Sequence, residues 1–148
     1  MTDSPLYDLV WMSRPLMQAA EASVEKGLVD TGLTVRMRAV LEMLHAHGDL
    51  TVPEIAERLE IKRQYVQLMV NETLAAGLTE QRPNPRHKRS PRLSLTETGA
   101  RLIAEVIARE LALIERIGAD LDPEEVTAAL RIVRALTAQL KSHAEEAP

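Results

Sequence analysis

Between Thr51 and Gly99 the chain carries a pattern that few folds can accommodate. Thr51-Val-Pro-Glu54 is a capping box, in which the Thr hydroxyl and the Glu carboxylate satisfy free amides at the start of a helix. The apolar periodicity that follows predicts a short helix over 52–59 and a second helix over 62–76, which Gly77 ends. Two helices this close in the chain predict a helix-turn-helix unit.

A cationic hairpin follows the second helix. Its predicted arms are 78–82 and 92–96, and the loop between them is Pro83-Asn-Pro-Arg-His-Lys-Arg-Ser-Pro91. Leu93 and Leu95 alternate with polar residues, as expected of a half-buried strand. A helix that fits the major groove, beside a hairpin rich in Arg and Lys, is the layout of a winged helix-turn-helix that binds duplex DNA.

Long apolar helices flank this unit. The first is predicted to begin at Ser4-Pro5 and to end near Gly27, with Pro15 kinking or dividing it. Thr34 is expected to cap the next helix, with Val35 on its buried side, and Ile61 is expected to face inward from the second helix of the turn unit.

The predicted fold class is mainly α with a small β-hairpin. We expect a single domain over 1–148, in which a winged helix-turn-helix carries long N- and C-terminal dimerisation helices. The DNA-binding part is predicted over about 34–98, and the dimerisation helices over 4–30 and 99–144. These terminal helices carry more apolar surface than a small core covers, which favours a two-fold homodimer over packing onto the winged unit.

Charge is distributed unevenly along the chain, whose net charge is −4. Residues 61–92 hold seven Lys and Arg against two Glu, a net charge of +5, so the remainder carries −9. A basic surface suits a polyanion, while the acidic remainder keeps the protein soluble. The alternative is an ordinary solvated run of charge, which the coincidence with the helix-turn-helix disfavours.

Composition excludes several other classes of protein. Aromatic residues make up 2% of the chain and Phe is absent, which disfavours single-stranded nucleic acids that stack on aromatic rings. Cys is absent, so disulfides and thiolate metal sites are excluded. The sequence shows no membrane-spanning run and no signal-peptide pattern, so we expect a cytoplasmic protein.

Catalytic and metal sites are not expected either. The sequence carries no serine elbow, phosphate-binding Gly loop or zinc-protease motif, so we expect no enzyme. His45 and His47 point in different directions on a helix and are interpreted as surface residues rather than zinc ligands. We expect no cofactor.

The order of these motifs resembles the MarR family, the multiple-antibiotic-resistance regulators of bacteria and archaea. The resemblance extends over essentially the whole chain. Its matching pieces are Leu33-Thr34, Thr51-Val-Pro-Glu-Ile-Ala-Glu-Arg-Leu59, Ala75-Ala-Gly-Leu78, Arg82-Pro-Asn-Pro-Arg-His-Lys-Arg-Ser90, Leu95-Thr-Glu-Thr-Gly99 and the Leu-Asp-Pro-Glu-Glu start of the last helix.

This resemblance implies a homodimeric transcription factor, commonly a repressor released by a small molecule bound between the dimer helices and the DNA-binding lobe. Two features depart from the family pattern. His87 stands where members often have an acidic wing residue, although Arg89 keeps the place of the Arg that enters the minor groove. The second helix offers Gln rather than Ser and Thr, which implies a different operator sequence.

The first turns of the second helix are expected to meet base edges. Gln64 and Gln67 can each bind adenine through two hydrogen bonds, and Arg63 can bind guanine in the same way. Lys62 is expected at a phosphate. Tyr65 is expected either to contact a phosphate or a thymine methyl, or to brace the helix as a partly buried aromatic residue.

The remaining candidates are Asn71 and the wing. Asn71 contacts the DNA backbone or lies on the surface, while Arg86, Lys88 and Arg89 are expected at the minor groove and phosphates, or else are solvated loop charges.

The sequence therefore predicts a regulator that binds a pseudo-palindromic duplex operator as a homodimer, responds to a small-molecule effector and does not enter membranes. The alternative is a winged-helix protein-interaction module without specific DNA binding. On the first helix, Tyr7, Trp11 and Met12 are interpreted as dimer core rather than as a ligand pocket.

Overall fold

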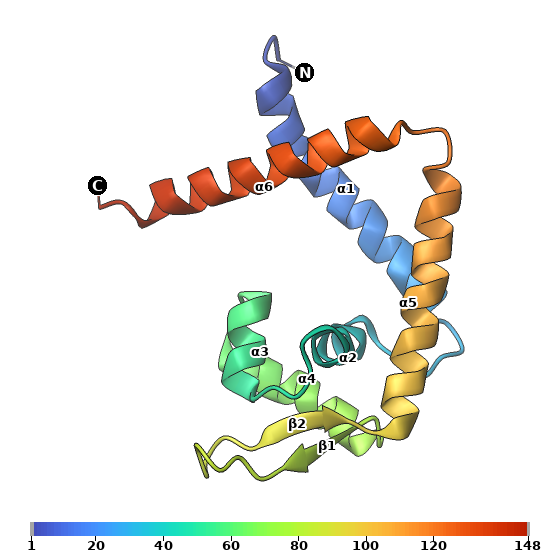
Figure 1. Cartoon of the computed structure of the whole chain (residues 1–148), viewed down its shortest axis with the longest axis vertical. Helices are drawn as coiled ribbons and strands as arrows, with labels where there is room; N and C mark the ends of the chain where they lie inside the picture. The colour runs from blue at the N-terminus through green and yellow to red at the C-terminus, as the bar shows by residue number, and fades with distance from the viewer. Residues whose placement is uncertain (1, 148) are drawn as a thin grey trace. The chain divides into compact units, whose positions relative to one another are not determined.

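The structure is a computed structural model that describes residues 2–147. This part of the chain is mainly helical and carries one two-stranded antiparallel sheet (Figure 1), which confirms the predicted fold class. Its elements are α1 (Pro5–Gly27), α2 (Val35–His47), α3 (Val52–Leu59), α4 (Arg63–Ala75), β1 (Thr79–Arg82), β2 (Arg92–Leu95), α5 (Glu97–Ile117) and α6 (Pro123–Glu145).

The chain forms two compact units. One unit is Gln18–Leu111 and contains α2 to β2, the last turns of α1 and most of α5. The other combines the residues up to Met17 with those from Ala112 onward, and so contains the beginning of α1, the end of α5 and all of α6. The winged helix-turn-helix lies entirely in the first unit.

Local capping sets where the helices of this unit begin. The Thr34 side chain accepts a hydrogen bond from the Met37 amide at the start of α2, and the Thr51 side chain accepts one from the Glu54 amide at the start of α3. The Thr51 hydroxyl also donates to the Glu54 carboxylate at 3.0 Å. The Glu54 carboxylate thus orients the Thr51 hydroxyl that caps α3.

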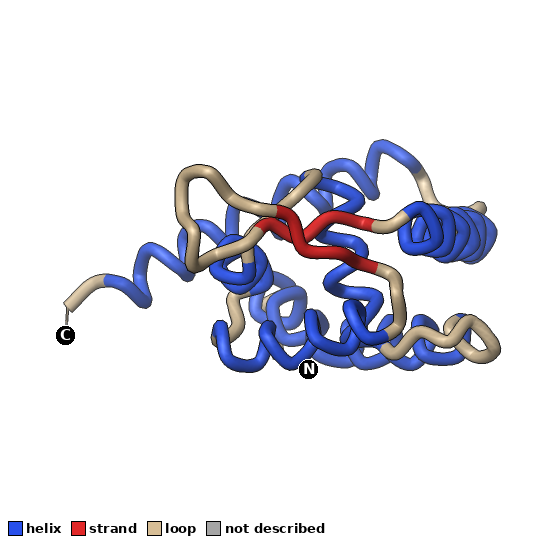
Figure 2. The backbone as a smooth tube through the Cα atoms, turned by 90° about the horizontal axis from the view of Figure 1, so that it is seen from below, coloured by secondary structure: helices blue, strands red, loops and turns tan. Residues whose placement is uncertain are grey.

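The hairpin pairs Thr79 with Leu95 at its base and Arg82 with Arg92 at its outer end. Figure 2 shows the two short strands and the long loop that connects them. Leu50 adds an isolated antiparallel bridge to Leu93, through backbone hydrogen bonds of 3.2 and 2.8 Å. This bridge ties the hairpin to the residue before the helix-turn-helix.

Aliphatic side chains build the core of the winged unit in two clusters. One cluster lies among α2, α3, α4 and β2 and centres on Val40, Ile55, Val66 and Leu93. The other contains Leu41 of α2 and Ile103 of α5, both fully buried. Burial of this kind is the main stabilising contribution to such a unit.

Some burial predictions were wrong. Val35 is 41% exposed and Ile61 is 37% exposed, because Val35 opens α2 and Ile61 precedes α4 in the turn, where neither meets a packing partner on all sides. Leu93 is buried as expected, but Ser94 is buried as well, so β2 does not alternate between a polar and an apolar face.

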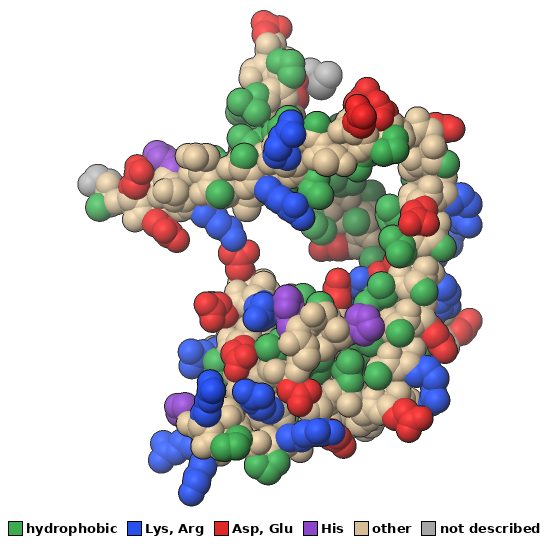
Figure 3. Space-filling view, in the orientation of Figure 1, with side chains coloured by type: hydrophobic (Ala, Val, Ile, Leu, Met, Phe, Trp, Pro, Cys, Tyr) green, Lys and Arg blue, Asp and Glu red, His purple; other side chains and the backbone are tan. Residues whose placement is uncertain are grey.

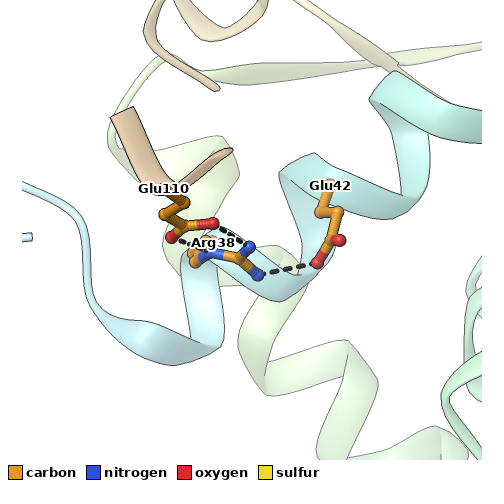
Figure 4. A network of polar contacts seen from close by, with 3 residues as sticks. All are labelled: Arg38, Glu42 and Glu110. Carbon is orange, nitrogen blue, oxygen red and sulfur yellow. Dashed lines mark hydrogen bonds and ion pairs between the residues drawn. The ribbon is translucent and has the colours of Figure 1, made fainter. Parts of the chain in front are cut away.

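A partly buried arginine joins α2 to α5 within the winged unit. The Arg38 guanidinium donates to both carboxylate oxygens of Glu110 on α5 and to Glu42 one turn along α2, at 2.5–2.7 Å (Figure 4). The hydrogen bonds to Glu110 raise the pKa of Arg38, against the opposing effect of burial. Arg38 therefore stays charged and holds the second half of α5, at Glu110, against α2.

The second unit leaves much apolar surface exposed. Neither α1 nor α6 contains a buried residue, and Trp11, Met12, Leu130 and Val133 are each about half exposed or more. Pro15 does not divide α1, which runs unbroken from Pro5 to Gly27, contrary to one of the two outcomes expected for it. None of the helices described is long and apolar enough to cross a membrane.

Candidate nucleic-acid interface

Helix α4 packs one face against the core and presents the other to solvent. Val66, Met69, Val70 and Thr73 are buried. Gln64 and Asn71, which lie two turns apart on the opposite face, are exposed. The core thus fixes which side chains α4 offers to a ligand, and we refer to α4 as the recognition helix.

The start of the recognition helix favours an anion. Lys62 occupies the N-cap position, and its side chain makes no capping hydrogen bond. Residues with an oxygen acceptor usually cap a helix here, because the first amides need partners and carry partial positive charge. A cation in their place leaves these amides to an external acceptor such as a phosphate oxygen.

A cleft of about 310 Å³ separates the recognition helix from the hairpin. Arg63, Gln64 and Gln67 line it from the helix, and Arg89 lines it from the loop between the strands. Residues predicted from two distant parts of the sequence therefore share one surface. Lys62 borders an adjoining hollow that also contains Arg63, so the predicted cations are not scattered over unrelated faces.

Gln67 and Asn71 are paired on the recognition helix. The Gln67 side-chain amide donates to the Asn71 Oδ1 at 2.9 Å, across one helical turn. The bond orients the Gln67 amide before any ligand arrives and occupies the Asn71 acceptor. Asn71 is thus placed to position Gln67, in addition to any contact of its own.

Tyr65 lies on the other flank of the recognition helix. A hydrogen bond with its side chain, followed by the charge of Glu72, raises the pKa of Arg36 on α2. Arg36 also forms an ion pair with Glu72 at 2.8 Å. Tyr65 is 44% exposed, and both its bracing role and its contact with DNA stay predictions.

Asn84 organises the loop of the hairpin. Its side chain donates to the Ser90 carbonyl at 3.0 Å and accepts from the Arg86 amide at 3.2 Å. Two successive turns follow, closed by hydrogen bonds from the His87 amide to the Asn84 carbonyl and from the Ser90 amide to the His87 carbonyl. Asn84 thus braces a loop in which His87 replaces the usual acidic residue.

The cations of this loop point outward. Arg86, Lys88 and Arg89 are all exposed, and Figure 3 shows Lys and Arg side chains gathered over the hairpin at the lower left. Of the predicted residues, Arg86 and Lys88 lie beside the cleft on the loop but do not line it. Their contact with DNA also stays a prediction.

Sequence reasoning missed three residues of this surface. Asn84 stands next to Pro in a turn-like run, a pattern that signals a loop but not which groups it bridges. Arg36 gave no signal, because its partners Tyr65 and Glu72 lie far along the chain. Leu68 was given no role, because it lies outside the apolar stripe that packs inward, and it is exposed.

Comparison with known proteins identifies the family of this chain. A model of the MarR family matches residues 31–90. The chain is 32% identical over 143 residues to the HTH-type transcriptional repressor MdtR of Bacillus subtilis, a match that covers 97% of this chain and 90% of MdtR. This chain belongs to the MarR family.

Other comparisons agree with this assignment. The crystal structure of the MarR family transcription regulator SP03579 superposes with a TM-score of 0.87 at 37% identity, covering 96% of this chain and 94% of SP03579. An uncharacterized Mycobacterium tuberculosis protein is 38% identical over 93 residues, which span 63% of this chain and 65% of that protein. MarR proteins are winged helix-turn-helix transcription regulators rather than enzymes.

No grouping of three or more potential metal-ligating side chains occurs within residues 2–147.

Proposed function

We propose that this MarR family chain binds a specific, pseudo-palindromic duplex DNA operator as a homodimer. The observation that carries the proposal is the cleft in which Arg63, Gln64 and Gln67 of the recognition helix face Arg89 of the wing, the hairpin β1–β2 with its loop. Amide and guanidinium groups are the side chains that bind adenine and guanine edges in the major groove. An Arg on an adjacent hairpin suits the minor groove and its phosphates.

The exposed apolar helices support the homodimer. In the second unit, Trp11, Leu130 and Val133 are exposed although they are apolar, and large exposed apolar side chains gathered on two helices favour an interface. A two-fold dimer buries the same patch on both copies and presents two recognition helices to a symmetric site. The residues from about 99–144 and 4–30 thus serve dimerisation in this proposal, and 34–98 serve DNA binding.

We further propose repression that a small-molecule effector relieves. The support is the similarity to MdtR, whose name describes a transcriptional repressor, together with the family resemblance of the sequence. An effector acts only through its different affinity for the DNA-fitting and non-fitting forms. Adding small acids and phenols to the protein–DNA complex tests this step.

A gel-shift series with the DNA upstream of the chain's own gene tests DNA binding. If the dimer neutralises about eight phosphates, the affinity falls roughly a thousandfold or more between 50 and 200 mM salt. Replacing Arg89 with Ala should weaken binding to all sequences and make the salt dependence shallower. Arg109→Ala, an exposed α5 residue outside the cleft, serves as the matched control and should bind as the unmodified protein does.

Two outcomes would contradict the proposal. Unchanged binding by Arg89→Ala removes the wing from the interface. Failure to retain any duplex at low salt instead supports the alternative, a winged-helix module that binds an acidic protein surface.

A further inference from the structure

The recognition helix exposes a leucine on its solvent-facing side. Leu68 is 61% exposed, which makes it the most exposed large apolar side chain within residues 34–98. It follows Gln64 by one turn and precedes Asn71 by one turn, so all three share a helical face. The opposite face of the helix already packs into the core, so Leu68 has no intramolecular burial to gain.

The surroundings of Leu68 identify what covers it. The other strongly exposed apolar side chains lie mostly on α1, α6 and the end of α5, whereas Leu68 stands among amides and cations. Residues 61–92 carry a net charge of +5, and Arg63 and Arg89 line the cleft beside the same helix. A polyanion is the partner that matches this charge, so the apolar contact must come from a group on duplex DNA.

Thymine supplies that group. An A·T pair presents, in the major groove, two adenine groups that hydrogen-bond an amide side chain, and the C5-methyl of thymine beside them. This methyl is the apolar group on the major-groove edges of the standard bases. Gln64 and Leu68 offer an amide and an apolar side chain one turn apart on the same face, which matches the A·T edge.

We propose that Leu68 is a specificity-determining residue that contacts a thymine C5-methyl group in each operator half-site. The inference rests on the proposed DNA binding and adds a preference for an A·T pair beneath Leu68. Unlike the cations, Leu68 contributes nothing to non-specific affinity, because it contacts no phosphate.

The test is a uracil scan of the operator. The operator is taken from the DNA upstream of the chain's own gene that the protein binds in the gel shift. Its thymines are replaced by deoxyuridine one position at a time, symmetrically in both half-sites, so that only the methyl group is lost. Removing a buried methyl weakens binding about fourfold per contact, and hence about fifteenfold for the symmetric pair. We expect this loss at one symmetric thymine pair and no change in the salt dependence.

Variants assign the loss to Leu68. Leu68→Ala should bind the thymine and uracil operators equally, with an affinity close to that of the unmodified protein for the uracil operator. Gln64→Ala is the matched control on the same face: it should bind more weakly, yet keep the difference between thymine and uracil. Thermal unfolding checks that the exposed substitutions leave the fold unchanged.

Two results would overturn the proposal without touching the proposed function. In the first, the unmodified protein binds every uracil-substituted operator as tightly as the original operator. In the second, replacing thymine with uracil weakens binding by Leu68→Ala as much as it weakens binding by the unmodified protein. Absence of any operator binding by the unmodified protein would instead refute the proposed function, and this inference with it.

Discussion

Gly99, at the start of α5, lies where the backbone leaves no room for a side chain. A Cβ atom on this residue would come within 2.0 Å of the Leu78 carbonyl oxygen. Next to it, the Thr96 hydroxyl donates to the Gly77 carbonyl at 2.8 Å and accepts from the Gly99 amide at 3.1 Å. A few atoms thus hold the beginning of α5 against the entry to the hairpin.

Replacing Gly99 with Ala should lower the free energy of unfolding. Because the added methyl meets rigid backbone rather than a flexible side chain, we expect a loss of about 1–3 kcal/mol, measured by thermal or urea unfolding. Gly27→Ala is the matched control, since nothing lies within 4 Å of a Cβ at that helical glycine. Equal stability of the two variants would show that the Leu78 backbone moves aside at no cost.

At the scale of elements, one partly buried ion pair connects α2 to α5. The side chains of Arg38 and Glu110 are only 16% and 24% exposed. The bond between them joins residues 72 positions apart in the sequence. Removing one partner leaves the other charge poorly solvated, which costs more than the loss of an exposed pair.

Glu110→Gln should therefore destabilise the winged unit by about 1–3 kcal/mol, since hydrogen bonds to charged groups contribute about that much. The exposed pair Arg82–Glu80 provides the comparison. Glu80→Gln should change the free energy of unfolding by less than about 1 kcal/mol. The idea fails if urea titrations give both variants the same stability.

The accuracy of sequence-based prediction also differs from element to element. The caps at Thr34, Thr51 and Asp122 act on amides two or three residues away, so the sequence predicts where α2, α3 and α6 begin. Burial depends on what a residue meets after folding. For that reason Val35 and Ile61 were assigned to the core although both are exposed.

The interface shows the same limit. The cations and amides of the cleft were predicted because their types and spacing match the groups of DNA. The bridges made by Asn84 and Arg36 were not, because they join groups whose proximity only the fold establishes. Periodicity places Leu68 on the solvent-facing side of its helix, opposite Val66 and Met69, but does not show what covers it.

At the scale of the whole molecule, the exposed apolar surface predicts self-association. Ile114 and Leu130 are 64% and 47% exposed, and we expect both to be covered by a second copy. Replacing the two with Glu places charges in an apolar interface and should convert a dimer into a monomer, as measured by light scattering. If the unmodified protein is already monomeric at micromolar concentration, this assignment is wrong.

Leu68→Glu is the matched control for this experiment. Its leucine is about as exposed as Ile114 but lies on the recognition helix, so the variant should stay dimeric and lose DNA binding. A monomeric Leu68→Glu variant would place the recognition helix in the contact between copies.

The division of charge has a consequence for the approach to DNA. Residues 61–92 carry +5 and the rest of the sequence carries −9, so in the proposed complex the field of a duplex attracts the wing and the recognition helix and repels the acidic remainder before contact. Collisions in the wrong orientation are repelled by the acidic surfaces, while those led by the wing are attracted. Orientation is thus selected during diffusion. The rate of association therefore falls as the ionic strength rises, because salt screens the attraction that acts before contact.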